Sequence, residues 1–467
     1  MLLPTGVLVL ALLWAPWPFG SVTPWAAALL MITGLSAFVL SFAPSIVGAP
    51  GLAALRPVAG PAGALALLAL LGWIQAATWP AGLTAVVSPE HLRLAVAAAA
   101  AGNGSGGGAG GGVPWSVAPA ASIRTALLLL SLSAYLGVAA FVGRRRSARR
   151  LLAAALLAGA LGQLFFGAPR WFRGSSTLWG AEIGGGGRLR GSFVNPNHFA
   201  LFLEIALAVA FAWGFWAARR AAREQAPERK VLLVAPPVLV WFVLFAGVAF
   251  SGSRGGLAAA VGATVVQGLL VASITFRHSR ARGLAWALSG TAVAVLGVAV
   301  VVFIGMEEGL GRLADTSAYD LTWSARLDAY GATLELWRLF PWLGSGLGTF
   351  IDVFPMVQPG RLEELWRHTH NDALELLVTG GLVGVTAAVL GLILLVHRLV
   401  RGLRFGTRTE DRAAAVAALG ALAAASAHDL LDFALTMPAV AVSLTIVLGA
   451  ACAAASRGDR GRGGRGR

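Results

Sequence analysis

Runs of hydrophobic residues follow one another along the chain, separated by short polar segments rich in glycine, proline and arginine. A run of about 20 apolar residues crosses a bilayer as a helix, and in lipid a helix satisfies its own backbone groups. The pattern predicts an all-α polytopic membrane protein with about 12 transmembrane helices. We expect the spans at 4–19, 24–46, 60–79, 123–142, 151–168, 198–218, 231–250, 255–275, 284–305, 372–396, 413–431 and 436–455.

Composition supports a membrane protein. The 467 residues are 57% hydrophobic and only 12% charged, which excludes an ordinary soluble domain. The single cysteine, Cys452, lies in an apolar run, so a disulfide framework and a thiolate metal cluster are excluded. The first residues lack a basic region, and we therefore expect a retained helix rather than a cleaved signal.

The net charge of +15 suggests nucleic-acid binding at first, but its distribution favours membrane topology. Most basic residues gather in short segments that fall on one side of the predicted spans: 144–150, 219–230, 277–282, 398–412 and the tail 456–467. Basic loops stay cytoplasmic. We therefore expect both termini inside, a basic cytoplasmic tail, membrane lipids as partners and no nucleic acid.

The predicted outer side carries three longer segments. Residues 95–113 are low in complexity and predict a flexible loop, and 169–197 form a medium loop. The largest is 306–371, in which residues 322–340 predict an amphipathic helix. Its apolar stripe is expected to pack: Leu327, Tyr330, Leu334 and Trp337. No second domain or internal repeat is visible, so residues 1–467 are expected to form one membrane domain with one large external loop that contains short amphipathic helices.

Arginines on the predicted outer side oppose the topology rule and call for a reason. In the segment RLRGSFVNPNHFA, 188–200, we expect Asn197 to cap the next span, with Arg188 and Arg190 just before it. In SGSRGG, 251–256, we expect Ser253 to be the cap, which places Arg254 in the first helical turn. A cation there opposes the helix dipole unless an anion binds. The alternative for both is a capped loop with an interfacial arginine.

Histidines add candidate acid–base chemistry. In HTHNDALELLVTGGLVG, 368–384, Asp372 and Glu375 have capping-box spacing, which leaves His370 just outside the helix, where a neutral imidazole can act as a general base. No ligand spacing compels a metal site.

The segment HDLLDF, 428–433, either lines the same cavity or caps a turn. Glu204 is the clearest acid within a span, and its role stays open.

These segments together resemble the O-antigen ligase family. The most specific match is His370-Asn371, nine residues, then Gly381 and Gly384. The GSFVNPNHFA and SGSRGG segments and the run from Arg326 through LGSGLGTF, 343–350, follow the family's order. The resemblance covers roughly residues 185–390. It departs from the family in the 95–113 loop and in the HTH triplet.

The resemblance implies a metal-independent, inverting membrane glycosyltransferase without a cofactor. Its donor would be a glycan on a polyprenyl, normally undecaprenyl, diphosphate, and its acceptor would be a lipid A core, another lipid-linked glycan or a protein group. His370 would be the catalytic base, with His368 as the competitor, and Arg254 and Arg326 would bind the diphosphate, with Arg190 as a third. The substrate-binding residues expected are Arg190, Arg254, Arg326, Asn197, His368 and Asn371. The site would face the exterior of the bacterial inner membrane.

One rival class is a transporter or flippase of an anionic lipid or small anion, without chemistry. Transporters place ionisable residues near the bilayer midplane and often contain inverted repeats. Here the notable charges lie at the ends of predicted helices on one side, and no repeat is visible. The pattern therefore favours the enzyme. A scaffold in polysaccharide export, which is the third alternative, would not need histidine.

Overall fold

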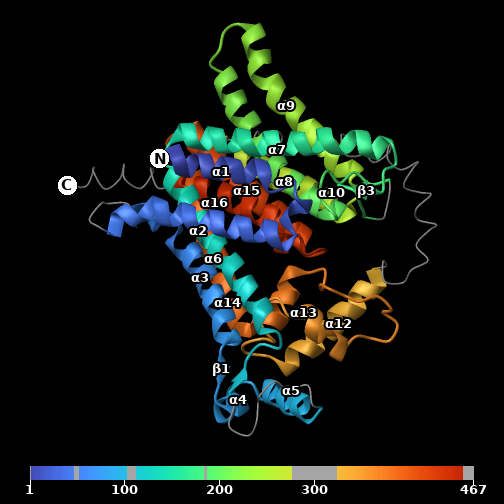
Figure 1. The fold of residues 1–467 in the computed structure, drawn as a ribbon. Helices are drawn as coiled ribbons and strands as arrows, with labels where there is room; N and C mark the ends of the chain where they lie inside the picture. Colours follow the sequence, from blue (N-terminus) through green and yellow to red (C-terminus); the bar gives the residue numbers. More distant parts are fainter. Residues whose placement is uncertain (1, 47–51, 102–111, 184–186, 276–322, 456–467) are drawn as a thin grey trace. The chain divides into compact units, whose positions relative to one another are not determined.

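The computed structural model describes residues 2–46, 52–101, 112–183, 187–275 and 323–455. Helices dominate these ranges (Figure 1), and the predicted all-α polytopic class is confirmed. Contacts divide the chain into two compact units. Unit 1 comprises Met1–Gly60, Ala134–Arg312 and Leu394–Arg467, and unit 2 comprises Pro61–Ser133 and Leu313–Ile393. The single membrane domain stays a prediction.

Nine helices among the described residues are long and apolar enough to cross a membrane, and each matches a predicted span. Two further spans correspond to helices outside that group: 4–19 to the shorter α1 (Leu2–Trp14), and 413–431 to α15 (Thr409–Asp429), whose first turn is charged. The predicted span 284–305 and the basic tail 456–467 lie outside the described residues. The total of about twelve therefore stays a prediction.

Unit 1 contains most of the long helices. Its elements are α1, η1 (Phe19–Ser21), α2 (Pro24–Ile46), η2 (Leu52–Ala54), η3 (Arg56–Val58), the second part of α6 (Pro119–Val142), α7 (Arg146–Phe172), β3 (Thr177–Leu178), β4 (Ala181–Glu182), α8 (Pro196–Ala221), α9 (Pro227–Phe250), α10 (Arg254–Thr275), the end of α14 (Asp372–Phe405), α15, η6 (Ala434–Thr436) and α16 (Pro438–Ala455). The antiparallel β3–β4 pair is a short ribbon.

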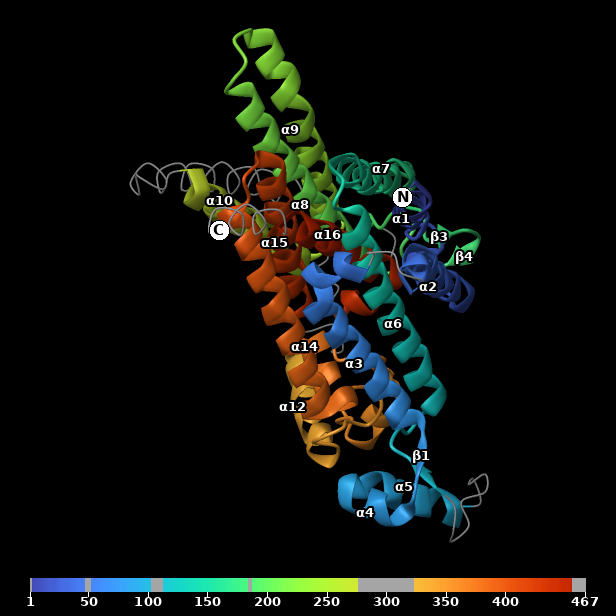
Figure 2. The ribbon, with the colours of Figure 1, turned by 90° about the vertical axis from the view of Figure 1, so that its left-hand side faces the viewer.

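Helix α8 forms the centre of unit 1. Its residues 198–210 are all buried, and α9, α15 and α10 pack against it, with α8 and α9 side by side as a hairpin (Figure 1 and Figure 2). The alanine-rich sequence of α15 allows this close approach, because small side chains bring helix backbones together. Gln267 of α10 donates hydrogen bonds to the Ala208 carbonyl of α8 at 2.9 Å and the Val416 carbonyl of α15 at 3.1 Å. One polar side chain thus joins three apolar helices.

Unit 2 contains shorter helices around a small core. Its elements are most of α3 (Ala59–Ala76), β1 (Thr78–Trp79), α4 (Ala81–Val87), α5 (Pro89–Ala100), β2 (Val113–Pro114), the start of α6, α12 (Trp323–Leu339), α13 (Phe350–Val353), η5 (Phe354–Met356) and the start of α14. The antiparallel β1–β2 pair lies beside α4 and α5 (Figure 2). Helix α5 extends through Ala100, so the first residues of the predicted 95–113 loop are helical, as expected of an alanine run.

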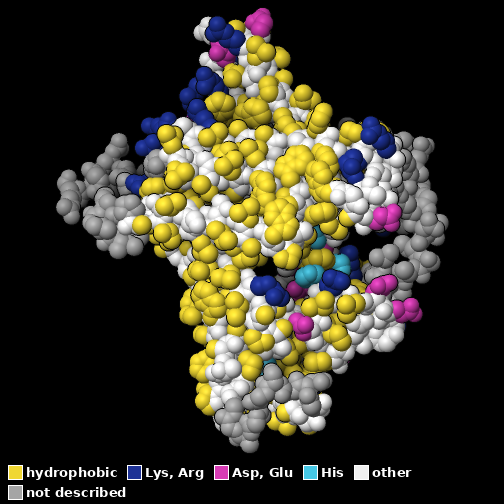
Figure 3. Space-filling view, viewed as in Figure 1, with side chains coloured by type: hydrophobic (Ala, Val, Ile, Leu, Met, Phe, Trp, Pro, Cys, Tyr) yellow, Lys and Arg dark blue, Asp and Glu magenta, His cyan; other side chains and the backbone are white. Residues whose placement is uncertain are grey.

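Apolar side chains cover much of the surface of unit 1. On the face in Figure 3 they spread over α1, α2 and α7. Leu10, Trp25 and Ile32 are each more than 60% exposed, and α9 exposes Leu232 and Leu239 in the same way. Such a surface is stable against lipid tails, which are as apolar as leucine. The exposed side chains therefore agree with the multi-pass class.

Candidate functional site

The start of α8 corrects one prediction. Asn195, and not Asn197, caps the helix, and its side-chain oxygen accepts a hydrogen bond from the Asn197 backbone N–H at 2.8 Å. Pro196 takes the first helical position, which suits proline because that position needs no N–H donor. The Asn197 side-chain oxygen instead accepts a hydrogen bond from Nη2 of Arg188 at 2.7 Å. Asn197 therefore orients an arginine.

Arg188 joins the two arginine-bearing segments of unit 1. Its Nε donates a hydrogen bond to the Ser251 carbonyl at 2.8 Å, and the Leu189 N–H donates to the Phe250 carbonyl at 3.0 Å. Gly252 has a φ of +66°, and a Cβ there would lie 3.1 Å from Nε of Arg188. The structure thus brings segments 188–200 and 251–256 together. Sequence reasoning treated Arg188 only as an interfacial residue and missed this role.

Arg190 lies on a loop that is fixed to α7. The backbone N–H and the hydroxyl of Ser192 both donate hydrogen bonds to Oε1 of Gln163 at 2.8 Å. Nη1 of Arg190 donates to the Val194 carbonyl at 3.1 Å. Partial burial lowers the pKa of Arg190, although a guanidinium stays charged in proteins. A half-buried, permanent cation therefore stands just before the start of α8.

Arg254 begins α10, as predicted. The Ser253 hydroxyl accepts a hydrogen bond from the Gly256 N–H at 3.1 Å, which confirms the predicted cap. Arg254 is exposed, and its guanidinium has no hydrogen bond or ion pair with any residue that the structure describes. Unpaired N–H groups and the helix dipole add positive potential at this position. The arrangement can attract an anion such as a diphosphate.

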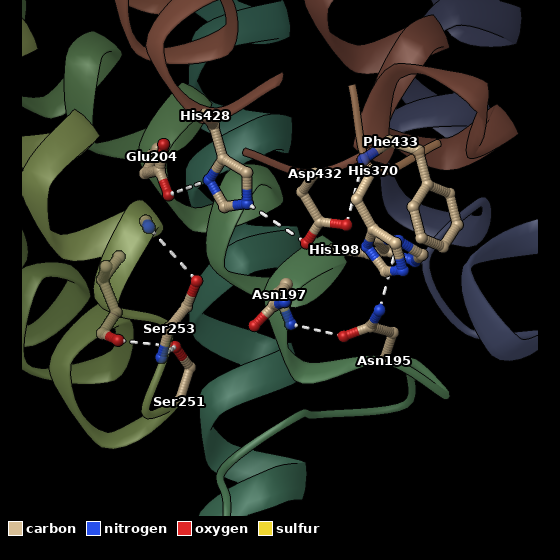
Figure 4. A network of polar contacts seen from close by, with 12 residues as sticks. Asn195, Asn197, His198, Glu204, Ser251, Ser253, His370, His428, Asp432 and Phe433 are labelled. Carbon is tan, nitrogen blue, oxygen red and sulfur yellow. Dashed lines mark hydrogen bonds and ion pairs between the residues drawn. The ribbon is translucent and has the colours of Figure 1, made fainter. Parts of the chain in front are cut away.

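A buried network lies beside this helix start (Figure 4). Nδ1 of His428 lies 2.8 Å from Oε1 of Glu204, and Nε2 lies 3.8 Å from Oδ2 of Asp432. All three side chains are at most 3% exposed. The pairing gives Glu204 the neighbour that the sequence could not name, and it puts the HDLLDF segment into unit 1 next to α8.

The network also explains why a glycine, Gly256, lies two residues after Arg254: a side chain there would meet α8. A Cβ on Gly256 would lie 2.8 Å from Oε1 of Glu204 and 3.0 Å from the Ala200 side chain. The neighbour that approaches the backbone at Gly256 is therefore helix α8. The Glu204 carboxylate therefore packs against the first turn of the helix that Arg254 begins.

In unit 2, the start of α14 holds the histidine loop and corrects the predicted capping box. Oδ1 of Asn371 accepts a hydrogen bond from the Leu374 N–H at 3.0 Å, so Asn371 caps the helix and Asp372 does not. Glu375 reaches back further than predicted. Its carboxylate accepts a hydrogen bond from the Thr369 N–H at 3.2 Å and lies 3.0 Å from Nδ1 of His368. The carboxylate favours a proton on Nδ1, so that Nε2 of His368 is the basic nitrogen.

His370 lies just outside α14, as predicted. Its backbone has a φ of +55°, a left-handed conformation that is uncommon outside glycine. The Tyr330 hydroxyl donates a hydrogen bond to the His370 carbonyl at 3.0 Å, and the Trp366 ring meets the imidazole edge to face at 5.4 Å. Strained backbone conformations gather at functional sites. The Tyr330 contact also brings segments 322–340 and 368–384 together within unit 2.

Helix α12 confirms the predicted helix but packs with another face. Leu327 is 51% and Leu334 is 41% exposed, whereas the buried face is formed by Ala325, Ala329, Ala332, Thr333 and Leu336. Small residues let α12 approach Phe350 and Phe354 closely. Arg326 lies in the first turn of α12 and is half-buried. The predicted packing stripe is therefore wrong at Leu327 and Leu334, whereas Trp337 of that stripe does pack against this core.

The LGSGLGTF run packs tightly in unit 2. Gln75 of α3 donates hydrogen bonds to the Leu343 and Thr379 carbonyls and accepts one from the Leu347 N–H. Gly344 has a φ of +77°, and a Cβ there would lie 2.3 Å from the Thr379 backbone. A Cβ on Gly381, within α14, would lie 2.3 Å from the Trp342 carbonyl. These glycines permit close backbone contact between the LGSGLGTF run and α14.

A comparison with protein families matches residues 238–389 to the model described as O-antigen ligase. This segment, about a third of the chain, is similar to the O-antigen ligase family. The predicted resemblance is thus confirmed, and it gives this multi-pass protein a glycosyltransferase-like role in O-antigen or polysaccharide biosynthesis. The comparison with curated proteins found no match.

Some of the candidate residues lie inside the matched region 238–389 and others lie outside it. This region contains Arg254 of unit 1 and Arg326 and His370 of unit 2, whereas Arg190 and the Glu204–His428 pair lie outside it. Within the described residues, no group of three or more histidine, cysteine, aspartate or glutamate side chains could hold a metal ion. Metal independence and the individual roles stay predictions.

Proposed function

We propose that the chain transfers a glycan from an undecaprenyl diphosphate donor to an acceptor on the outer face of the inner membrane. The acceptor class is a hydroxyl of a lipid A core or of another lipid-linked glycan, and a protein hydroxyl or amide is the third option. The observation that carries the proposal is Arg254, an exposed cation without a described partner at the capped start of α10.

The chemistry needs a stabilised leaving group. The bond between the anomeric carbon and the diphosphate oxygen breaks, and negative charge develops on the undecaprenyl diphosphate that departs. An arginine stabilises this charge with a permanent cation and paired donors, and the effect grows where water is excluded. Arg254 is assigned to the diphosphate, with Arg326 as its partner in this role and Arg190 as the third. Asn197 acts indirectly, because it orients Arg188.

The acceptor must lose a proton as its oxygen bonds to the anomeric carbon on the face opposite the leaving group. His370 takes this proton in the proposal, and the product has inverted configuration. His368 and Asn371 flank His370 and keep the loop in place through Glu375 and the α14 cap. If His368 were the base instead, Glu375 would orient its imidazole, as a carboxylate does in other histidine-based catalysis.

The test is glycan transfer by the purified full-length protein from an undecaprenyl diphosphate glycan. His370→Ala is expected to lower the rate by 10²-fold or more, since general base catalysis contributes about 10²–10⁴-fold. His397→Ala is the matched control, because His397 is exposed at the far end of α14. A folded His370→Ala protein that transfers at the wild-type rate would remove His370 as the base, and loss in His368→Ala alone would transfer the role to His368.

A second experiment addresses the diphosphate. Arg254→Lys keeps the charge but loses the paired donors, and we expect transfer to fall about tenfold or more. Arg173→Lys is the control, because Arg173 is also exposed and also predicted to lie outside. Equal activity of the two variants would contradict diphosphate binding by Arg254.

The remaining outcomes separate the enzyme from its rivals. Transfer is expected to survive exhaustive chelation, and loss that a single metal restores would contradict a metal-independent mechanism. Absence of transfer with every acceptor class, together with movement of the donor across liposomes, would favour a flippase.

A further inference from the structure

A cavity of about 570 Å³ lies within unit 1, between the start of α7, the end of α8, the middle of α9 and the start of α15. Its walls are almost entirely apolar and include Ala154, Leu157, Leu161, Val209 and Ala413. The volume falls within the range of small-molecule sites in proteins, about 300–1,000 Å³. Such a lining suits a hydrocarbon chain and offers few partners for water.

One end of the cavity carries charge. Arg146, Arg149 and Arg150 of α7 line it together with Glu410 of α15. Arg149 is paired with the buried Asp411 at 2.7 Å and is thereby part of the α7–α15 contact. Arg146 and Arg150 share the single carboxylate of Glu410. Two guanidinium groups on one carboxylate leave an excess positive charge at the mouth of an apolar cavity.

Two tryptophans also line the cavity, and one of them contacts the arginine side chains at its charged end. Trp213 and Trp216 of α8 line the cavity, and the guanidinium carbons of Arg150 and Arg220 lie 5.8 and 5.6 Å from the Trp216 ring centre. Tryptophan favours the level of lipid headgroups, and cations bind well over its ring. Figure 3 also shows basic side chains gathered around the α8–α9 hairpin.

We propose that this cavity binds an anionic glycerophospholipid, with an acyl chain between α7, α8 and α15 and the phosphate on Arg146 and Arg150. Basic pockets between membrane helices bind anionic lipid headgroups. A zwitterionic lipid lacks the net charge that this mouth selects, and free phosphate would leave the apolar cavity unfilled.

The site is distinct from the proposed donor site. Trp216 is 20 residues along α8 from Pro196, which corresponds to roughly 30 Å along the helix axis. Arg188 and the Asn195 cap are at the opposite end of α8 from the cavity. The proposal therefore does not depend on the glycosyl-transfer proposal, and either can fail without the other.

The test is native mass spectrometry of the full-length protein after incubation with equal amounts of phosphatidylglycerol and phosphatidylcholine of identical acyl chains. Wild type is expected to retain phosphatidylglycerol selectively. Arg146→Ala/Arg150→Ala should lower this retention about tenfold or more, from the loss of two cations. Arg145→Ala is the matched control, because Arg145 is exposed in the same arginine run and does not line the cavity. Equal retention of both lipids by wild type would overturn the proposal.

Two single variants separate lipid binding from a structural role of the arginines. Glu410→Gln should increase phosphatidylglycerol retention, because it removes the carboxylate that competes with the phosphate; unchanged or lower retention in a folded protein would contradict the proposed headgroup site. Ala154→Phe should reduce retention without any change in charge, because it fills the cavity. Normal retention in Ala154→Phe, together with displacement of the lipid by millimolar inorganic phosphate, would reduce the site to a phosphate site and overturn the acyl-chain assignment.

Discussion

The two units each contain a histidine–carboxylate pair, and the pairs differ in accessibility rather than in contact. In unit 1, Nδ1 of His428 lies 2.8 Å from Glu204, and both side chains are at most 1% exposed. In unit 2, Nδ1 of His368 lies 3.0 Å from Glu375, and the side chains are 28% and 10% exposed. The same contact therefore has two settings, one closed and one open to a substrate.

The difference separates positioning from proton transfer. A base must come within hydrogen-bonding distance of the proton that it removes. The closed pair cannot do so without movement of α8 or α15, and its contact with the first turn of α10 makes it a support for Arg254. The open pair is adjacent to His370 in the chain and fixes the loop that carries it. We therefore propose a structural role for the closed pair, Glu204 and His428. We propose that the open pair, Glu375 and His368, positions the loop that carries the catalytic base.

The largest expected effect breaks the closed pair. Glu204→Ala leaves His428 buried without its main carboxylate partner, and removal of one member of a buried ion pair costs about 3–5 kcal/mol. The free energy of unfolding should fall by that amount, as measured by denaturant titration of the purified protein in detergent. Glu182→Ala is the control, because Glu182 is exposed in the β3–β4 ribbon, and it should leave stability unchanged.

If Glu204→Ala were as stable as Glu182→Ala, the closed pair would not stabilise unit 1, and its structural role would be contradicted. A double variant, Glu204→Ala/His428→Ala, refines this test. Because the two side chains act as a unit, the loss in the double variant should be clearly smaller than the sum of the losses in the single variants. Additive losses would mean that the pair is not coupled.

The second effect is on activity and concerns the open pair. Glu375→Ala removes the acceptor of the Thr369 N–H and the partner of His368, so that the loop loses its anchor. Small displacements of catalytic groups cost up to about 10²-fold in rate. We expect kcat for transfer to fall about 10- to 100-fold with little change in KM, and Glu375→Gln to recover part of the rate because it can still accept a hydrogen bond.

The control for this variant is Glu335→Ala, which removes an exposed carboxylate from α12. It should transfer at the wild-type rate. If Glu375→Ala raised KM and left kcat unchanged, Glu375 would contribute to substrate binding, and its role in positioning the loop would be excluded.

Local patterns predicted much of the molecule. The spans followed from apolar runs, and Ser253 was identified as a cap because serine before a helical run satisfies free N–H groups. At Asn195-Pro196-Asn197, two asparagines competed as the cap. The preference of proline for the first helical position points to Asn195, and this signal in the sequence was not used.

Long-range partners could not be predicted. Glu204 and His428 are 224 positions apart, and no local pattern links Arg188 to the Ser251 carbonyl. The face of α12 was missed for another reason. The leucines are the most hydrophobic side chains of this helix, but its close packing uses small side chains, so hydrophobicity did not identify the packed face. Small residues would have been the better guide, since Ala329 and Ala332 mark the interface.

The smallest expected effect concerns the backbone conformation of His370, which lies in the same loop as the open pair. His370 has a φ of +55°, a conformation that glycine adopts without the strain that a side chain adds. His370→Gly and His370→Ala should both abolish the proposed proton transfer, but the glycine variant should be more stable than the alanine variant by about 1 kcal/mol. At an ordinary position alanine would be the more stable, because glycine loses more chain entropy on folding. Unfolding of both variants in the same detergent measures the order. An alanine variant that is the more stable would mean that the loop relaxes to negative φ, and the strained conformation would then not be what presents His370.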